Sequence, residues 1–170
     1  MKKLIIVCGL PVTGKSSLAE DLAKKLRLPL LSVDPIESAI IKAGFSRSFE
    51  TGLSAYLVAE SVAAENLKLD SSVIIDAVSG VPEAKNMWRD LSKKYEAKLI
   101  IIECICSNGT THKARIKARV RSIHGIPEVK WADVLKRKSE AVAWDEPTLV
   151  IDSINDRAEN YFKALKYVSD

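Results

Sequence analysis

The sequence predicts an α/β protein of three layers, in which a five-stranded parallel sheet is covered by helices on both faces. Five short and almost continuously apolar runs alternate along the 170 residues with segments whose apolar residues have helical spacing. Strands of this kind are typical of parallel sheets that are buried on both faces and joined by right-handed crossovers. A glycine-rich loop lies directly between the first strand and the first helix. With 47% apolar residues, we expect one domain over residues 1–170.

The first strand and the first helix follow from the residues around the glycine-rich loop. Residues 4–8 form an apolar, β-branched run, and the helix after the loop repeats Leu18, Leu22 and Leu26 at a spacing of four. A second apolar run, over residues 28–33, predicts the next strand. Strand, loop, helix and strand therefore follow one another in the order of a βαβ unit.

The middle of the chain is predicted to be mainly helical. Residues 35–70 have a helical pattern that is interrupted near Gly44 and Gly52, which indicates two helices. A short strand is expected over residues 72–76, and the proline that follows it predicts the start of a helix over residues 82–95.

The last third of the chain contains two further strands, over residues 98–106 and 148–152. Between them, the basic segment 111–125 and the segment 129–142 are both predicted to be helical, and residues 155–168 form the last helix. The basic segment has one apolar stripe that we expect to pack inward while its cations surround it, formed by Ile116, Val120 and Ile123.

The loop after the first strand matches the phosphate-binding pattern G-x-x-x-x-G-K-[ST]. Glycines allow the backbone to wrap a phosphate with its N–H groups turned inward, and the following helix directs its positive end at the anion. Lys15 is predicted to reach the β- and γ-phosphates of a nucleotide, and Ser16 to bind Mg²⁺ through its hydroxyl. The other predicted nucleotide contacts of the pattern are Gly9, Pro11, Val12, Thr13 and Gly14.

Val12 is an unusual residue for such a loop because it is β-branched. If its backbone has a positive φ angle, the loop is strained or the nucleotide site is altered.

Three aspartates are predicted to lie at strand ends, where ligands gather in a doubly wound sheet. Asp34 is placed to accept a proton from an attacking hydroxyl, although it is also a candidate N-cap for a helix beginning at Pro35. Asp76 is placed to hold Mg²⁺ through water or to bind the substrate. Ala77 follows it, so the acidic pair of many motor ATPases is missing and phosphoryl transfer is favoured over hydrolysis. Asp152 is interpreted as a cap of the last helix.

Arg115 and Arg119 are four residues apart and therefore share one face of the predicted basic helix. A lid segment of this kind can place two guanidinium groups on a polyphosphate. The alternative is a solvated basic face, which we favour for Lys113, Lys117 and Arg121.

The histidines and cysteines show no spacing typical of a metal site. His112 and His124 are interpreted as surface or hinge residues. Cys8, Cys104 and Cys106 are odd in number, which does not suggest a disulfide framework, and we expect buried structural thiols in a cytoplasmic protein.

The net charge of +4 makes a large nucleic-acid channel doubtful, so nucleic acid is not the expected partner. No stretch approaches the about 20 apolar residues that span a bilayer, so we expect a soluble protein without membrane attachment.

Five motifs follow one another in order along the chain, and they are GLPVTGKSS, Asp34-Pro35, SVIIDA, RIKAR and WDEPTLVID. These five motifs resemble those of the small P-loop kinases. Within that group the sequence is similar to the AAA_33 type, which is related to chloramphenicol phosphotransferase, gluconate kinase and the kinase domain of polynucleotide kinase. The phosphate loop of such proteins usually reads GLPGxGKS, so Val12 replaces a glycine.

The resemblance implies a P-loop NTPase fold with an acceptor-binding segment at about residues 35–70 and a small helical lid at about residues 108–128. It also implies ATP and Mg²⁺ as cofactors. The residues that match the family pattern are Gly14, Lys15, Ser16 and Ser17 for the ATP-Mg²⁺ donor, Asp34 for the acceptor hydroxyl, and Arg115 and Arg119 for lid contacts.

The function predicted from these residues is ATP-dependent transfer of the γ-phosphate to a hydroxyl of a small molecule, by a monomer or a homodimer. A nucleoside monophosphate kinase needs a second arginine clamp in the acceptor segment, where Arg47 stands alone. A polynucleotide 5′-hydroxyl kinase needs a basic channel. A nucleotide-binding regulatory module without turnover is the alternative from another class, and Val12 is the feature that supports it.

Overall fold

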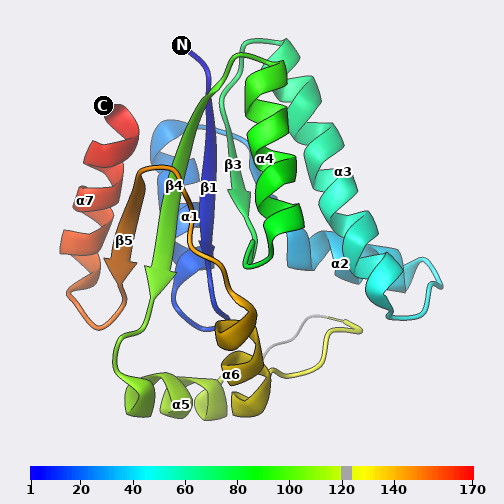
Figure 1. Cartoon of the computed structure of the whole chain (residues 1–170), viewed down its shortest axis with the longest axis vertical. Helices are drawn as coiled ribbons and strands as arrows, with labels where there is room; N and C mark the ends of the chain where they lie inside the picture. The colour runs from blue at the N-terminus through cyan, green and yellow to red at the C-terminus, as the bar shows by residue number, and fades with distance from the viewer. Residues whose placement is uncertain (120–123) are drawn as a thin grey trace.

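The computed structural model describes residues 1–119 and 124–170 and contains a five-stranded sheet in the order β2-β3-β1-β4-β5 (Figure 1). Every pair of neighbouring strands is parallel, which confirms the predicted fold class. The strands are β1 (Lys3–Gly9), β2 (Leu30–Ser32), β3 (Val73–Asp76), β4 (Lys98–Ile105) and β5 (Thr148–Asp152).

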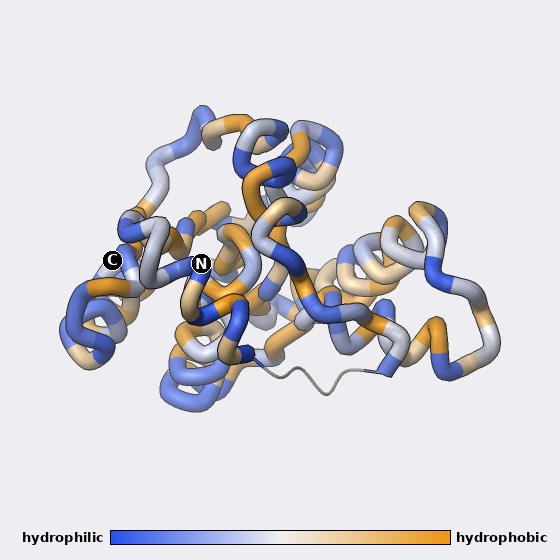
Figure 2. Tube along the Cα trace, turned by 90° about the horizontal axis from the view of Figure 1, so that it is seen from below, coloured by the Kyte–Doolittle hydropathy of each residue, from blue (hydrophilic) through white to orange (hydrophobic). Residues whose placement is uncertain are grey.

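Helices cover both faces of this sheet because the central strands present apolar side chains on both sides. Leu4 and Ile6 of β1 pack toward α3 (Phe49–Lys68) and α4 (Pro82–Lys94), whereas Ile5 and Val7 pack toward α1 (Lys15–Leu26) and α7 (Arg157–Ser169). Along the helices, hydrophobic and hydrophilic residues alternate, as expected of helices that bury one face (Figure 2). The helices are α1 (Lys15–Leu26), α2 (Val33–Lys42), α3 (Phe49–Lys68), α4 (Pro82–Lys94), α5 (Gly109–Ala118), α6 (Trp131–Glu140) and α7 (Arg157–Ser169).

The break between α2 and α3 differs from the sequence prediction. Gly52 lies inside the first turn of α3, so the break between α2 and α3 is near Gly44 and not at Gly52. The start of α3 is fixed by a capping box, in which Ser48 and Thr51 exchange side-chain and backbone hydrogen bonds. A strong N-cap therefore overrides the low helix propensity of one glycine.

All five strands point their carboxyl ends to the same end of the molecule, and α5 and α6 lie across that end (Figure 1). The predicted basic helix is shorter than expected, because α5 ends at Ala118. Ile116 of its apolar stripe is buried, and Lys113 and Lys117 are exposed as predicted. The other predicted members of this segment lie outside the described residues: Val120, Arg121 and Ile123.

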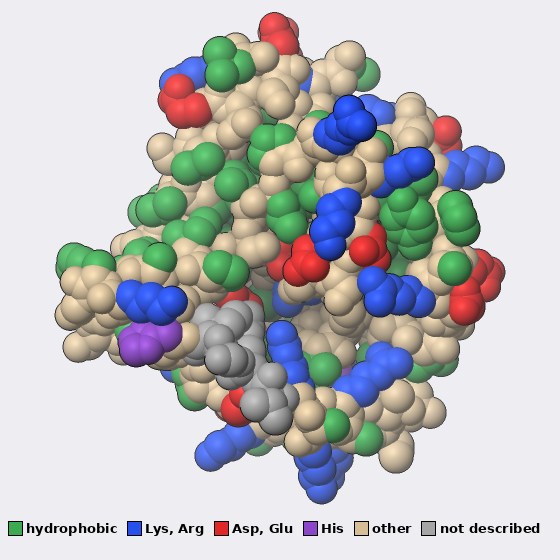
Figure 3. Space-filling view, turned by 180° about the vertical axis from the view of Figure 1, so that it is seen from behind, with side chains coloured by type: hydrophobic (Ala, Val, Ile, Leu, Met, Phe, Trp, Pro, Cys, Tyr) green, Lys and Arg blue, Asp and Glu red, His purple; other side chains and the backbone are tan. Residues whose placement is uncertain are grey.

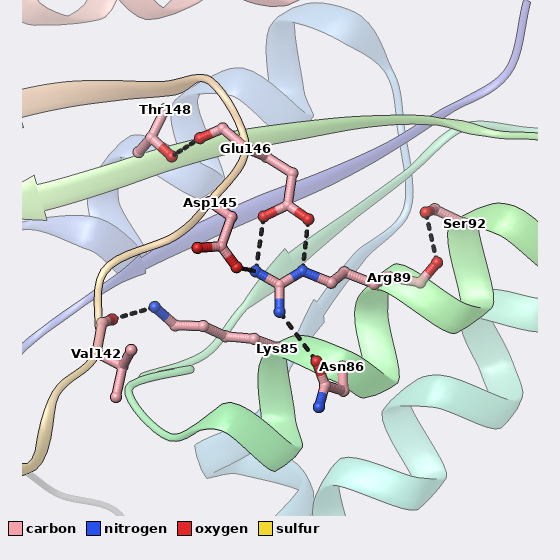
Figure 4. Close-up of polar contacts among 8 residues, drawn as sticks. All are labelled: Lys85, Asn86, Arg89, Ser92, Val142, Asp145, Glu146 and Thr148. Atoms are coloured by element: carbon pink, nitrogen blue, oxygen red, sulfur yellow. Dashed lines mark hydrogen bonds and ion pairs between the residues drawn. The ribbon is translucent and has the colours of Figure 1, made fainter.

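The segment between α6 and β5 is fixed to α4 by two cations (Figure 4). Lys85, which is almost fully buried, donates to the carbonyl of Val142 and lies 4.7 Å from the ring of Trp144. Arg89 forms a two-point ion pair with Glu146 and a further hydrogen bond of 3.0 Å to Asp145. These contacts hold the C-terminal side of α6, and therefore help to place α6 over the end of the sheet.

No helix within the described residues is both long and apolar enough to cross a membrane.

Candidate active site at the phosphate loop

The phosphate loop connects β1 to α1, and its two glycines have conformations that other residues rarely adopt. Gly9 has φ of 139°, and a Cβ atom on it would lie 2.1 Å from the carbonyl oxygen of Cys104. Gly14 has φ of 86° and directly precedes α1. Both positions therefore require glycine, for contact with β4 and for the turn into the helix.

Val12 has φ of 64°, so the condition for strain in the loop is met. A β-branched side chain in the left-handed region is a genuine outlier and costs about 1–3 kcal/mol unless its surroundings hold it there. Two hydrogen bonds hold the neighbouring residues. Thr13 donates from Oγ1 to the carbonyl of Leu10 at 2.8 Å, and the Pro11 carbonyl lies 2.7 Å from Nε2 of His112.

The N-terminus of α1 is suited to an anion. No side chain from the described part of the chain caps this helix, so its first backbone N–H groups keep their hydrogen-bonding capacity. Ser16 is partly buried and Ser17 is exposed in the first turn. A phosphate at this helix end would accept from these N–H groups and benefit from the helix dipole.

Lys15 and Asp76 form a buried ion pair at the base of the loop. Nζ of Lys15 lies 3.9 Å from Oδ1 of Asp76, and only 8% and 7% of the two side chains are exposed. Asp76 ends β3 at the place predicted for it, and its Oδ1 has no hydrogen-bond partner among the described residues. A buried carboxylate oxygen of this kind normally has a partner, and a hydrated cation can provide one.

The residues present therefore fit a magnesium ion. Mg²⁺ retains several waters and takes only one or two protein ligands beside substrate phosphates, so a large cluster of acids is not needed. Among the described residues, no three His, Cys, Asp or Glu side chains gather as a metal site. Ser16 and Asp76 are the residues that would hold this ion.

A polar cavity of about 330 Å³ opens beside the loop, and Lys15 and Asp34 both contribute to its wall. Charged side chains of both signs gather around the hollow in the lower half of the face shown in Figure 3. Basic and acidic residues are equally numerous in the described lining. They are Lys15, Arg47, Arg119, Lys136 and Arg137, and Asp34, Glu37, Glu128, Asp133 and Glu140.

Asp34 occupies the first turn of α2, which begins at Val33. Its interpretation as the N-cap is therefore wrong, because the N-cap position is Ser32. Burial raises the pKa of the neighbouring Tyr56 hydroxyl, and the charge of Asp34 shifts that pKa in the same direction. The phenol is thus kept protonated next to the carboxylate. Tyr56 also accepts a hydrogen bond of 3.3 Å from the backbone N–H of Ser79.

The two predicted lid arginines have different surroundings. Arg115 donates from Nη1 to Oγ of Ser153 at 2.8 Å and from Nη2 to the Ser153 carbonyl at 2.9 Å. Ser153 lies next to Gly14, since a Cβ on that glycine would be 3.8 Å from the Ser153 Cβ. Arg119 follows the last residue of α5 and lines the cavity. The structure thus connects Arg115 to Ser153 beside the phosphate loop and places Arg119 in the wall of the cavity that Lys15 and Asp34 also line.

Comparison with known proteins assigns the chain to a family. Residues 4–141 match the family model AAA_33, which is described as an AAA domain. The chain belongs to the AAA_33 family. AAA_33 proteins are P-loop kinases, and the resemblance stated from the motifs is thereby confirmed.

Individual relatives of this AAA_33 chain are described as kinases. It is 27% identical over 173 residues to the bifunctional polynucleotide phosphatase/kinase of Schizosaccharomyces pombe (strain 972), an alignment that covers 99% of this chain and 36% of that protein. The chain thus spans about a third of this relative.

Solved structures with the same fold are also described as kinases. A protein from Chloroflexus aurantiacus, described as a candidate kinase, has a TM-score of 0.80 and 26% identity, with 99% of this chain and 97% of that chain covered. A gluconokinase from Sinorhizobium meliloti 1021 has a TM-score of 0.71 and 16% identity, with 98% and 91% covered. The second likeness shows the fold alone.

Sequence reasoning missed the contribution of α6 to the AAA_33 site. Lys136 and Arg137 lie on α6 and line the cavity together with Asp133. The basic run around Arg137 was visible in the sequence, but its pattern predicted only that segment 129–142 is helical. Its position depends on the segment between α6 and β5, whose contacts with α4 are not local in sequence.

Two further interpretations are wrong because tertiary contacts use the side chains differently. His112 is 4% exposed and contacts the phosphate loop, whereas His124 is exposed as expected. Asp152 does not cap α7, since the cap is Asp156, which accepts from the backbone N–H of Glu159. Asp152 instead accepts from the backbone N–H of Ser107 at 3.1 Å and so ties the end of β5 to the loop before α5.

The cysteines are separate thiols, and two of the three have the predicted burial. Burial raises the pKa of Cys8 and of Cys104 to about 12, so both remain protonated and inert. Cys106 is only partly buried and accepts a weak contact of 3.8 Å from Arg115, which corrects the prediction for this residue.

Proposed function

We propose that this AAA_33 protein transfers the γ-phosphate of ATP to a hydroxyl group of a small polar molecule. The observation that carries the proposal is the shared cavity of Lys15 and Asp34. Lys15 belongs to the loop that binds donor phosphates in this family of kinases, and Asp34 lies in the first turn of α2, directly after strand β2. A donor phosphate on one wall and a carboxylate on the other leave room between them for an acceptor hydroxyl.

The roles of the residues follow from their chemistry. Lys15 and the N-terminus of α1 would neutralise the charge of the transferring phosphoryl group, and Asp34 would orient the acceptor hydroxyl and accept its proton. Arg119 and Arg137 line the same cavity and would contact phosphate oxygens or the acceptor. When bound at Ser16 and Asp76, Mg²⁺ would neutralise phosphate oxygens.

The acceptor is proposed to be polar and close to neutral. The lining carries equal numbers of basic and acidic side chains, and Arg47 is already paired with Glu37 at 3.7 Å. Lys136 likewise lies 3.9 Å from Glu140. A polyhydroxylated or amino-substituted compound can satisfy such alternating charges, whereas a polyanion would meet the acids.

A polynucleotide 5′-hydroxyl end is a second candidate acceptor, because the relative from Schizosaccharomyces pombe is a polynucleotide phosphatase/kinase and matches 99% of this chain. Its recognition would need cations beyond the nucleotide site to contact successive phosphates. The balanced charge of the described lining favours the small polar acceptor.

Thermal unfolding with ATP-Mg²⁺, GTP-Mg²⁺ and no ligand tests the donor site, since a ligand that binds only the folded state must raise the midpoint. The proposal predicts a rise for the wild type and none for Lys15→Ala. Lys24→Ala is the matched control, because Lys24 is exposed on the same helix and lies away from the loop. No rise at millimolar nucleotide would contradict the proposal.

Acceptor classes are then compared by ADP release with sugars, amino sugars, nucleosides and an oligonucleotide bearing a 5′-hydroxyl. Stimulation by a small polyol or amino sugar supports the first candidate. Stimulation by the oligonucleotide alone would replace it with the second. Nucleotide binding without stimulation by any acceptor is the result expected of a regulatory module.

A further inference from the structure

The imidazole of His112 is bonded to the backbone of the phosphate loop. Its Nε2 lies 2.7 Å from the carbonyl oxygen of Pro11, and the residue is 4% exposed. A carbonyl oxygen only accepts hydrogen bonds, so Nε2 must carry the proton and donate it. The proposed roles in phosphate contact, metal binding and proton transfer do not require this hydrogen bond. The residue that accepts it, Pro11, directly precedes Val12.

The Pro11 carbonyl belongs to the peptide unit that enters Val12. Because a peptide unit is planar, its carbonyl and the N–H of Val12 turn together. Val12 is held at φ of 64°, where a β-branched residue is strained, and its relaxation to a negative φ requires this peptide unit to reorient. A hydrogen bond that fixes the Pro11 carbonyl therefore opposes the relaxation of Val12.

The position of His112 is itself fixed by two helices. On α5, the backbone N–H of His112 donates to the Asn108 carbonyl at 2.9 Å, and the Asn108 side chain caps the helix by accepting from Thr111 at 2.9 Å. The imidazole also meets the ring of Trp131 edge to face, with the centroids 5.5 Å apart. Trp131 is the first residue of α6. His112 thus connects the phosphate loop with both helices that lie across the end of the sheet.

We propose that His112 is a positioning residue of the nucleotide site, which holds the phosphate loop in its binding conformation despite the valine at position 12. The inference rests on the proposed donor site. A glycine at position 12 would adopt the same φ without strain and would not need the bond. The conformation of the phosphate loop therefore depends, through His112, on the positions of α5 and α6.

A double-mutant cycle separates this role from ordinary packing. The dissociation constant of ATP-Mg²⁺ is measured by calorimetry for the wild type, His112→Leu, Val12→Gly and the double variant. Loss of the bond is expected to weaken binding about tenfold when Val12 is present and about twofold or less when the Val12→Gly substitution removes the strain. A structural role unrelated to Val12 would give the same factor in both backgrounds and would overturn the proposal.

His112→Gln is the conservative control, because its side-chain amide can donate from a nitrogen at a similar distance from the backbone. We expect it to bind ATP-Mg²⁺ within about threefold of the wild type. If His112→Gln binds ATP-Mg²⁺ as weakly as His112→Leu does, the hydrogen bond donated to the Pro11 carbonyl does not support nucleotide binding.

Failure of the donor site would be recognised separately, because the wild type would then bind neither ATP-Mg²⁺ nor GTP-Mg²⁺. The same cycle is therefore also measured by thermal unfolding without nucleotide. The proposal predicts that His112→Leu lowers the midpoint less in the wild-type background than in the Val12→Gly background, because loss of the bond allows Val12 to relax and recovers its strain energy. Equal decreases would contradict it whether or not nucleotide binds.

Discussion

Lys15 and Asp76 are joined in an ion pair at the base of the phosphate loop, with Nζ and Oδ1 3.9 Å apart and less than a tenth of each side chain exposed. The pair connects the loop after β1 with the end of the adjacent strand β3. Lys15 is the nearest cation to a carboxylate oxygen that lacks a hydrogen-bond partner among the described residues. Each buried charge is therefore compensated by the other.

Removal of Lys15 alone is predicted to destabilise the protein. Lys15→Met would leave the buried carboxylate of Asp76 uncompensated, and we expect the free energy of unfolding to fall by about 3–5 kcal/mol. The double variant Lys15→Met/Asp76→Asn should recover at least half of this loss, since no unpaired charge remains. Urea unfolding without nucleotide measures both values. Equal stability of Lys15→Met and the wild type would contradict the coupling.

Replacement of Val12 by glycine is predicted to stabilise the protein. Relief of the left-handed strain outweighs the entropic cost of glycine, and the free energy of unfolding should rise by about 1 kcal/mol. Val62→Gly is the matched control, because Val62 is an exposed valine inside α3 whose φ angle is not positive. That variant should lose stability instead. A decrease for Val12→Gly in chemical unfolding would show that the loop carries no strain.

The ion pair of Arg89 and Glu146 is predicted to make stability depend on acid pH. Hydrogen bonding to Arg89 lowers the pKa of Glu146 below its ordinary value of 4.5. The stabilisation is therefore fully present above that value, and it is lost as the pH falls through the lower pKa of the folded protein. Glu146→Gln should cost about 1 kcal/mol near neutral pH and progressively less below about pH 4.5.

Asp145→Asn controls for the general effect of removing a carboxylate next to Arg89. The Asp145 side chain is 92% exposed, although it bonds to the same guanidinium. Its replacement should change the free energy of unfolding by less than about 0.5 kcal/mol at any pH. The two variants are compared by urea unfolding from neutral to acid pH, and a cost for Glu146→Gln that does not change with pH would refute the assignment.

Arg115 is predicted to support nucleotide binding through the loop after β5. Lysine keeps the charge but cannot make both contacts with Ser153, so Arg115→Lys should weaken ATP-Mg²⁺ binding about fivefold. Lys113→Ala, which alters an exposed cation on the same helix, should leave the dissociation constant unchanged. Calorimetric titration distinguishes the two, and an unchanged dissociation constant for Arg115→Lys would contradict the prediction.

The fold and the donor half of the site could be predicted because their signals are local. The glycines, Lys15 and Ser16 are fixed by one short motif between a strand and a helix, and Asp76 directly ends an apolar run. Parallel strands then bring the ends of β1, β2 and β3 together, so the proximity of Asp34 and Lys15 follows from the order of elements.

The remaining part of the site depends on contacts between distant segments. His112 and Asp152 have no unusual sequence neighbours, and their roles arise only where α5 meets the phosphate loop and the end of β5. The position of Arg137 likewise depends on the contacts that Lys85 and Arg89 of α4 make with the segment after α6. Helical spacing can predict that such helices form, but it does not predict where they cross the sheet.

The central claim is that Asp34 and Lys15 face one another across a phosphoryl-transfer site, and the fate of the γ-phosphate tests it most directly. ATP labelled in that phosphate is incubated with Mg²⁺ and the acceptors that stimulate ADP release, using the wild type and Asp34→Asn. We predict that the wild type places the label on the acceptor. Asp34→Asn should turn over about 100-fold more slowly, with an unchanged dissociation constant for ATP-Mg²⁺. Label found only in inorganic phosphate, or equal turnover by the two proteins, would contradict the account.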